Sequence, residues 1–227
     1  MKNRARTQLP GDFAEPLARA AATLGLALTP AQQQSLLDYL ALLGKWNAAY
    51  NLTAVRDPRE QLVVHLFDCL AILPAMQRWL HPGAVVADIG SGGGLPGVVI
   101  AICHPEVEVH TVDAVGKKAA FVTQVRAALG LTNLHAHHAR VETLASGRDL
   151  PGADLIVSRA FASLADFIGL TAHLRAPAGR WLAMKGVLPA DELAALPPGV
   201  KLEKAIALQV PELDAQRHLL VLNAEPA

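Results

Sequence analysis

A glycine-rich turn is the part of this chain best suited to chemistry. It follows an apolar segment at residues 85–89 and reads Gly90-Ser91-Gly92-Gly93-Gly94-Leu95-Pro96-Gly97. Glycine permits positive φ angles and, having no Cβ, lets a ligand approach the backbone closely. A second apolar segment ends in Asp113, whose carboxylate can accept hydrogen bonds from both hydroxyls of a ribose. The spacing predicts a nucleotide cofactor site, although Asp113 could also act only as a helix cap.

Three classes of ligand compete for such a turn. A dinucleotide site has G-x-G-x-x-G spacing with a helix starting at once, but position 95 is Leu rather than the third glycine. A phosphate-binding P-loop requires Gly-Lys-Ser or Gly-Lys-Thr, which the turn lacks. S-adenosylmethionine carries no phosphate, and a D-x-G-x-G-x-G turn starting at Asp88 offers its backbone to the methionine part. The sequence therefore favours S-adenosylmethionine as the cofactor.

Strand-like and helix-like segments alternate from about residue 84 onward. Strands are expected at 84–89, 107–112, 134–137, 154–158 and 180–184, and helices at 95–103, 117–129, 164–174 and 190–196. This order predicts a parallel sheet with helices on both faces. Segments 204–210 and 217–223 are joined by a short loop and should pair antiparallel. A parallel sheet ending in such a hairpin is typical of the class I S-adenosylmethionine-dependent methyltransferase fold, a Rossmann-like α/β fold with seven strands.

The segment before the glycine turn is predicted to be helical. Thr29 followed by Pro30 marks one helix start, and Asp57 followed by Pro58 marks a second helix, which should end at Pro74. We therefore divide the chain into a tail at 1–16 that is expected to be disordered, an N-terminal helical extension at 17–80 and a methyltransferase domain at 81–227.

Composition places the chain among ordinary globular proteins. Its 227 residues are 52% hydrophobic, enough to bury a full core. The charges of the 20 basic and 20 acidic residues cancel, so the net charge gives no indication of a nucleic-acid partner. No apolar run approaches the roughly 18 residues of a membrane span, and the N-terminus has no apolar signal core. We expect a cytoplasmic monomer without membrane contact.

The two cysteines are expected to be buried thiols. Cys69 and Cys103 each lie in an apolar helical segment, and neither neighbours a second soft ligand. We expect neither a disulfide nor a metal site.

The sequence resembles the bacterial ribosomal RNA small subunit methyltransferase G family, also called glucose-inhibited division protein B, over nearly the whole chain. The motifs that carry the resemblance are Lys45-Trp46-Asn47, Tyr50-Asn51-Leu52-Thr53, His65 with Asp68, the turn from Asp88 to Gly97, Asp113 with Gly116-Lys117-Lys118, Ser158-Arg159-Ala160-Phe161-Ala162, Lys185-Gly186, Pro211-Glu212-Leu213 and Arg217-His218-Leu219. Cys69 departs from the family pattern, in which Ser is common at this position.

The resemblance implies methyl transfer from S-adenosylmethionine to N7 of guanine 527 in the 16S ribosomal RNA of the 30S subunit. The cofactor contacts that it implies, together with the glycines of the turn, are Gly90, Gly92, Gly94, Leu95, Asp113, Val141, Glu142 and Arg159. These residues are expected near the carboxyl ends of parallel strands, where open α/β sheets bind ligands. Glu142 could instead be an ordinary surface residue.

The missing catalytic motifs agree with a ring nitrogen as the acceptor. Guanine N7 carries a lone pair and no proton, so it needs no general base, and we assign none. The Asn-Pro-Pro-Tyr block typical of exocyclic-amine methylation is replaced by Ser158-Arg159-Ala160-Phe161, and neither cysteine is placed as a nucleophile. Catalysis would then rest on orientation. Arg159 could orient the cofactor or pair with a guanine acceptor such as O6.

Several basic and polar residues could contact the RNA. The candidates are Lys45, Asn51, Arg56, Lys117, Lys118 and Lys185. Lys185 could equally be a solvated strand end, and Trp46 is expected to pack in the core rather than stack on a base. His65 is expected to be a satisfied helix residue, although its helix, with Asp68, is a further candidate surface.

Two other functions stay open at this point. The chain could be a non-catalytic S-adenosylmethionine-binding RNA chaperone or assembly factor, which would bind the cofactor without transferring the methyl group. It could also be a nicotinamide-dependent oxidoreductase, which is favoured only by the glycine turn and Asp113.

Overall fold

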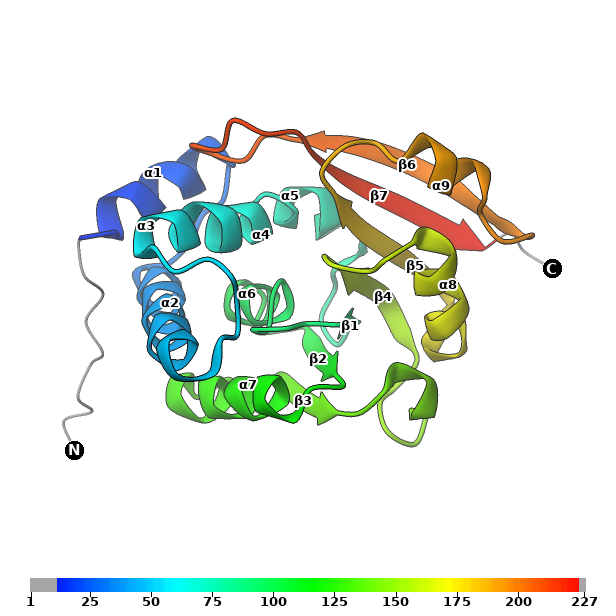
Figure 1. The fold of residues 1–227 in the computed structure, drawn as a ribbon, viewed down its shortest axis with the longest axis horizontal. Helices are drawn as coiled ribbons and strands as arrows, with labels where there is room; N and C mark the ends of the chain where they lie inside the picture. The colour runs from blue at the N-terminus through cyan, green and yellow to red at the C-terminus, as the bar shows by residue number, and fades with distance from the viewer. Residues whose placement is uncertain (1–11, 225–227) are drawn as a thin grey trace.

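A seven-stranded sheet between two layers of helices forms the centre of the protein (Figure 1), as seen in a computed structural model that describes residues 12–224. The strands are β1 (Val85–Ile89), β2 (Glu108–Asp113), β3 (Leu134–His138), β4 (Ala153–Ser158), β5 (Arg175–Lys185), β6 (Val200–Leu208) and β7 (Arg217–Ala224). Their order across the sheet is β3-β2-β1-β4-β5-β7-β6. β1 to β5 pair in parallel, whereas β7 pairs antiparallel with both β5 and β6. The predicted class I fold and its terminal hairpin are confirmed.

The helices divide between the two faces of this sheet. They are α1 (Ala14–Thr23), α2 (Pro30–Tyr50), α3 (Pro58–Gln61), α4 (Asp68–Leu70), α5 (Leu73–Met76), α6 (Gly97–Cys103), α7 (Gly116–Leu129), α8 (Leu164–Thr171) and α9 (Ala190–Ala194). The π-helix η1 (Leu62–Phe67) and the 3-10 helices η2 (Gln77–Trp79), η3 (Val141–Thr143) and η4 (Ala172–Leu174) complete the set. Helices α1 to α7 lie on one side of the sheet, and α8 and α9 lie on the other (Figure 1).

Helix α2 begins where its local sequence predicts. The Thr29 hydroxyl accepts a hydrogen bond from the Gln32 N–H (3.2 Å), and the Gln32 side chain accepts one from the Thr29 N–H (2.9 Å). This reciprocal capping box satisfies two N–H groups that a helix start leaves without partners. The helix ends at Asn51, which has a left-handed φ of 49°.

The second helix differs from the sequence prediction in two ways. It continues past Pro74, because Pro74 lies in the first turn of α5, where its missing N–H breaks no helical hydrogen bond. Its middle is the π-helix η1, which widens the turn around His65. Among the described residues, Pro58–Trp79 is also the helical stretch long and apolar enough to span a membrane, but its apolar window is mostly buried inside the protein.

Part of the tail that was predicted to be disordered is helical. Residues 1–11 lie outside the described residues, but α1 already includes residues 14–16, for which disorder was predicted. Phe13 and Leu17 pack into the main core, and this burial organises the segment. The one local signal is Asp12, whose Oδ1 accepts a hydrogen bond from the Ala14 N–H (3.1 Å), since Phe13 itself makes no side-chain capping bond.

The helical extension and the sheet share one hydrophobic core. Alternate residues of each central strand face opposite sides, so Val86 of β1 packs with α2 and η1 while Ala87 packs with α8. Leu40 of α2 and Leu66 of η1 are fully buried in the same cluster as Val86. The extension therefore folds as part of the sheet's own core.

Replacing Leu40 with Ala tests this shared core. We expect a loss of about 2–5 kcal/mol in the free energy of unfolding, since the change opens a cavity between α2 and the sheet. Urea unfolding followed by tryptophan fluorescence and by far-UV circular dichroism should give one coincident transition at a lower midpoint. The matched control is Leu170→Ala on α8, where the leucine is exposed and the midpoint should stay nearly unchanged. Two separate transitions would contradict a shared core.

Candidate functional site

The glycine turn has the backbone geometry that the sequence predicts. Gly90, Gly92 and Gly94 have φ values of 69°, 58° and 86°. A Cβ on Gly94 would lie 2.5 Å from Val98 Cγ2, which is closer than two non-bonded carbon atoms can approach. The turn follows the carboxyl end of β1, which is the edge where parallel sheets bind ligands.

Asp113 joins this turn to the next helix. Its Oδ2 accepts a hydrogen bond from the Gly92 N–H (2.9 Å), and its Oδ1 accepts one from the Val115 N–H (2.8 Å) at the start of α7. Asp113 therefore satisfies a backbone N–H at the start of α7 and also holds the glycine turn in place. Each carboxylate oxygen has two lone pairs, so both keep capacity for a ribose hydroxyl. Lys118 Nζ lies 3.8 Å from Oδ2, which turns this lysine toward the cofactor side.

Tyr39 and Asp88 hold the turn from two further directions. The Tyr39 hydroxyl of α2 donates a buried hydrogen bond to the Gly93 carbonyl (2.7 Å). Asp88 Oδ2 accepts one from the Gly97 N–H (2.8 Å), while its Oδ1 is buried without a partner among the described residues. Burial raises the pKa of Asp88 to about 7. A group that bears positive charge and donates hydrogen bonds would suit this carboxylate.

Arg159 is fixed by the π-helix. Its Nη1 donates to the Val64 carbonyl (3.1 Å), contacts His65 Nδ1 (3.4 Å) and lies 3.6 Å from Asp68 Oδ2. A guanidinium can only donate, so Nδ1 of His65 is the acceptor and its proton lies on Nε2, which is 2.8 Å from the Thr53 hydroxyl. Burial, and then the charge of Arg159, lower the pKa of His65 to about 4. His65 is therefore neutral at pH 7 and orients Arg159.

Asp68 connects two arginines that are distant in sequence. Its Oδ1 accepts a hydrogen bond from Arg217 Nε (3.0 Å), and its Oδ2 faces Arg159. Burial raises the pKa of Asp68, and the two arginines offset part of that rise. His65 and Asp68 are both buried, so they line a pocket rather than form an open RNA-facing surface.

This pocket has a volume of about 390 Å³, within the usual range for small-molecule sites, about 300–1,000 Å³. It is lined by Val64, His65, Asp68, Arg159, Met184, Lys185, Gly186 and Arg217. Lys185 is no solvated strand end, because its Nζ lies 3.0 Å from both carboxylate oxygens of Glu192 and its side chain is 16% exposed.

Three of the proposed RNA-binding residues gather at the C-terminus of α2. Arg56 Nη2 donates to Asn51 Oδ1 (2.9 Å), and Lys117 Nζ donates to the Tyr50 carbonyl (2.8 Å). Tyr50 is 49% exposed beside them, and Lys45 is exposed earlier on α2. Trp46 packs against Phe121 with ring centroids 5.4 Å apart, in agreement with its predicted structural role.

The remaining predicted residues differ in their exposure. Val141 and Glu142 lie in η3, which follows β3. Val141 is buried, whereas Glu142 is half exposed and its Oε1 lies 3.6 Å from Arg140 Nη1. Leu95 is buried in the turn. Cys69 is a buried free thiol as predicted, while Cys103 is free but only half-buried.

The structure adds residues that sequence reasoning did not select. Tyr39 and Arg217 reach the site from far along the chain. Arg217 belongs to a motif of the resemblance but was given no role, and no motif includes Tyr39. Glu108 and His110 on β2 lie beside His135 on β3, on the same face of the sheet. Burial lowers the pKa of His110 to about 4. The signal for this cluster was available as Glu-x-His and His-x-His in two predicted strands.

Comparison with known proteins finds relatives that match most of the chain. The family model described as rRNA small subunit methyltransferase G matches residues 32–220. A ribosomal RNA small subunit methyltransferase G from Burkholderia vietnamiensis is 53% identical over 207 residues, covering 91% of this chain and 90% of the relative. The protein of the same name from Burkholderia multivorans is 52% identical over 212 residues, covering 93% and 92%.

Solved structures share the fold at low identity. A SAM-dependent methyltransferase from Thiobacillus denitrificans, in complex with S-adenosyl-L-homocysteine, has a TM-score of 0.56 at 15% identity, covering 81% of this chain and 98% of that chain. One from Geobacter sulfurreducens, also with S-adenosyl-L-homocysteine, has a TM-score of 0.53 at 14% identity with the same coverage. These similarities support the class I assignment of the fold.

Asp88→Asn should change how stability depends on pH. The unfolded chain releases the Asp88 proton near the ordinary pKa of 3.8, whereas the folded protein keeps it up to a pKa of about 7. Stability from this group is therefore greatest at low pH and is lost as pH rises through 7. Between pH 5 and 8 we expect the wild type to lose about 2 kcal/mol relative to the variant, measured by urea unfolding. Parallel pH profiles for the two proteins would contradict the buried, proton-binding state of Asp88.

Proposed function

Because the chain belongs to the ribosomal RNA small subunit methyltransferase G family, we propose that it transfers the methyl group of S-adenosylmethionine to N7 of guanine 527 in 16S ribosomal RNA. The observation that carries the proposal is the polar pocket around Asp68, Arg159 and Arg217. Arg159 follows β4, which pairs with β1, the strand that leads into the glycine turn. We place the protein in the cytoplasm as a monomer, with the 30S subunit or its RNA as the partner.

The turn and its surroundings fit S-adenosylmethionine. Backbone at Gly90, Gly92, Gly94 and Leu95 would line the methionine part, and Asp113 would hold the ribose. Asp88 offers a buried carboxylate oxygen without a protein partner, which suits a positively charged cofactor. Val141 and Glu142 would border the adenosine end. The cofactor supplies an electrophilic methyl group on a sulfonium centre.

The pocket matches the hydrogen-bonding groups of guanine. Asp68 can accept hydrogen bonds from the N1–H and the exocyclic amine, while Arg159 and Arg217 can donate to O6. These contacts would leave N7 free to face the methyl group. Arg159 is suited to set this alignment, because three neighbours hold its guanidinium in one place.

The reaction needs no proton acceptor at N7. His65 is neutral, and both of its ring nitrogens already have partners, so it serves to position Arg159 rather than to move a proton. Rate acceleration would come from holding the nucleophile, the methyl carbon and the sulfur in line.

RNA would approach across the C-terminus of α2. Lys117, Arg56 and Asn51 meet there beside the exposed ring of Tyr50, and Lys45 extends the same surface along α2. Cations on such a surface neutralise phosphates and give salt-dependent affinity. The target guanine must lie in an open loop, because the major groove of an A-form helix encloses N7.

The decisive experiment uses labelled S-adenosylmethionine and 30S subunits, or 16S RNA, from cells that lack the modification. We expect one labelled base, mapped to N7 of guanine 527. Label on an exocyclic amine or a ribose would refute the proposed acceptor. Cofactor binding without any label would instead support the non-catalytic assembly factor, and binding of a nicotinamide cofactor would support an oxidoreductase.

Asp113→Asn and Lys117→Ala should separate cofactor binding from RNA binding. The first should weaken S-adenosylmethionine binding by about tenfold, because the amide cannot accept from both ribose hydroxyls and hold the turn. The second should weaken RNA binding a few-fold and lower the salt slope by about 1. Calorimetry and filter binding measure the two affinities. Lys204→Ala on the distant strand β6 is the control that should change neither.

Arg217→Gln tests the acceptor pocket. Arg217 contacts Asp68 but not the glycine turn, so we expect kcat to fall at least tenfold while the Kd for S-adenosylmethionine stays within twofold. Single-turnover methylation and cofactor titration give the two values. A parallel loss of cofactor affinity would place Arg217 in the cofactor site instead.

A further inference from the structure

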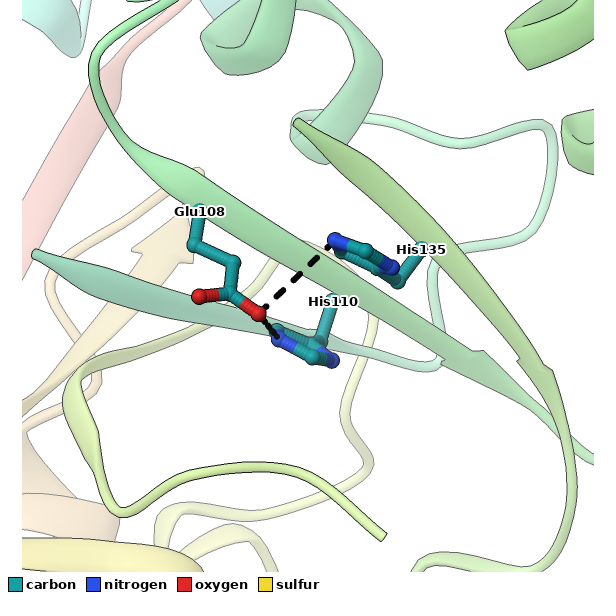
Figure 2. A group of neighbouring side chains, drawn as sticks. All are labelled: Glu108, His110 and His135. Carbon is teal, nitrogen blue, oxygen red and sulfur yellow. Dashed lines mark hydrogen bonds and ion pairs between the residues drawn. The ribbon is translucent and has the colours of Figure 1, made fainter. Parts of the chain in front are cut away.

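Three side chains with metal-ligating atoms meet on strands β2 and β3, away from the glycine turn. Glu108 and His110 are two residues apart on β2 and therefore point to the same face. His135 is the register partner of His110 on β3. Figure 2 shows the carboxylate of Glu108 directed toward both imidazoles.

The separations suit a single small cation. Glu108 Oε1 lies 2.9 Å from His110 Nε2 and 3.7 Å from His135 Nε2 (Figure 2), and the three ligand atoms all lie within 4.8 Å of one another. With metal–ligand bonds of about 2.0–2.1 Å, ligand atoms in a tetrahedral zinc site are about 3.3 Å apart. These two separations lie on either side of that value, so small rotations of the Glu108 and His135 side chains would bring the ligand atoms to the distances of a zinc site.

We propose that Glu108, His110 and His135 bind a divalent transition-metal ion of the zinc class. Two imidazoles and one carboxylate form a borderline ligand set that prefers zinc to magnesium or calcium. Three protein ligands leave one coordination position for water.

A second histidine orients the buried ligand. His137 Nε2 lies 2.9 Å from His110 Nδ1. In the metal-bound form, His110 donates its Nδ1 proton to His137, so its Nε2 lone pair faces the ion; such partners commonly fix the tautomer of a metal-bound histidine. Without metal, the Nε2 proton of His110 instead bonds to Glu108. Binding of the ion would therefore change His110 from its Nε2–H tautomer to its Nδ1–H tautomer.

The cluster is open to solvent on one side. Side chains of Glu108 and His135 are 40% and 35% exposed, whereas that of His110 is 5% exposed. β3 is an edge strand, and the described connection from β3 to β4 contains η3 but no longer helix to cover this face. An ion can therefore reach the buried imidazole from outside.

The metal would act on the sheet rather than on methyl transfer. Glu108 begins β2 and Asp113 ends it, so about 16 Å of extended strand separate the two carboxylates. A bound ion would link β2 to the edge strand β3 and stabilise their pairing. This inference is independent of the proposed reaction.

Cobalt(II) serves as the probe, with the full-length protein freed of any histidine tag. Titration should produce the visible absorption of four-coordinate cobalt with a stoichiometry of one, and zinc should abolish it by displacement. Zinc at 100 times its Kd should raise the Tm by about 5–10 °C. A wild-type protein that gives no saturable cobalt spectrum would overturn the proposal.

His135→Gln is the main variant, since His135 is half exposed and its loss should not prevent folding. We expect cobalt affinity to fall at least tenfold, and His137→Gln to weaken it less. The matched control is His104→Gln. His104 Nδ1 lies 3.0 Å from Glu106 Oε1, and among the described residues this pair belongs to no group of three possible metal ligands. Cobalt affinity that persists in His135→Gln, or that falls equally in His104→Gln, would also reject the site. Cofactor affinity should stay unchanged in His135→Gln.

Discussion

Close packing around the glycine turn is the constraint on which the rest of the site depends. A Cβ on Gly97 would lie 2.9 Å from Asp88 Oδ2, and one on Gly93 would lie 3.0 Å from Leu43 Cδ1. Strand β1, helix α2 and helix α6 therefore all meet the turn directly. Hydrogen bonds from Tyr39 and to Asp113 hold it in this narrow space. A rigid backbone surface results, and such preorganisation lowers the cost of ordering a ligand.

The helical extension completes the pocket around Asp68 and Arg159. Val64, His65 and Asp68 come from the extension, whereas Arg159 and Arg217 come from the sheet. The π-helix matters here, because it carries both the Val64 carbonyl and the His65 ring that hold Arg159. The hydrophobic core that the extension shares with the sheet holds these two groups of residues in fixed positions relative to each other. The extension therefore contributes directly to the lining of the pocket.

Ionisable side chains gather at two separate places on the sheet. The carboxyl ends of the central strands hold Asp88, Asp113 and Arg159, whereas the beginning of β2 holds the cluster of Glu108 with His110 and His135. The first group surrounds the turn where a charged cofactor would bind. The second lies where no long helix among the described residues covers the sheet. One sheet can thus carry two polar sites that do not share a side chain.

Sequence alone determined the alternation of strands and helices along the chain from about residue 84, the terminal hairpin, the glycine turn and the position of Asp113 at the end of a strand. These follow from alternation, capping and glycine geometry, which act over a few neighbouring residues. Tertiary structure decided the rest. Pro74 was tolerated because a new helical segment starts beside it, and residues 14–16 became helical because Phe13 and Leu17 found a core. The bond between Asp68 and Arg217 spans 149 positions, and strand register brings His110 beside His135. Such contacts depend on how distant elements pack, which local pattern does not encode.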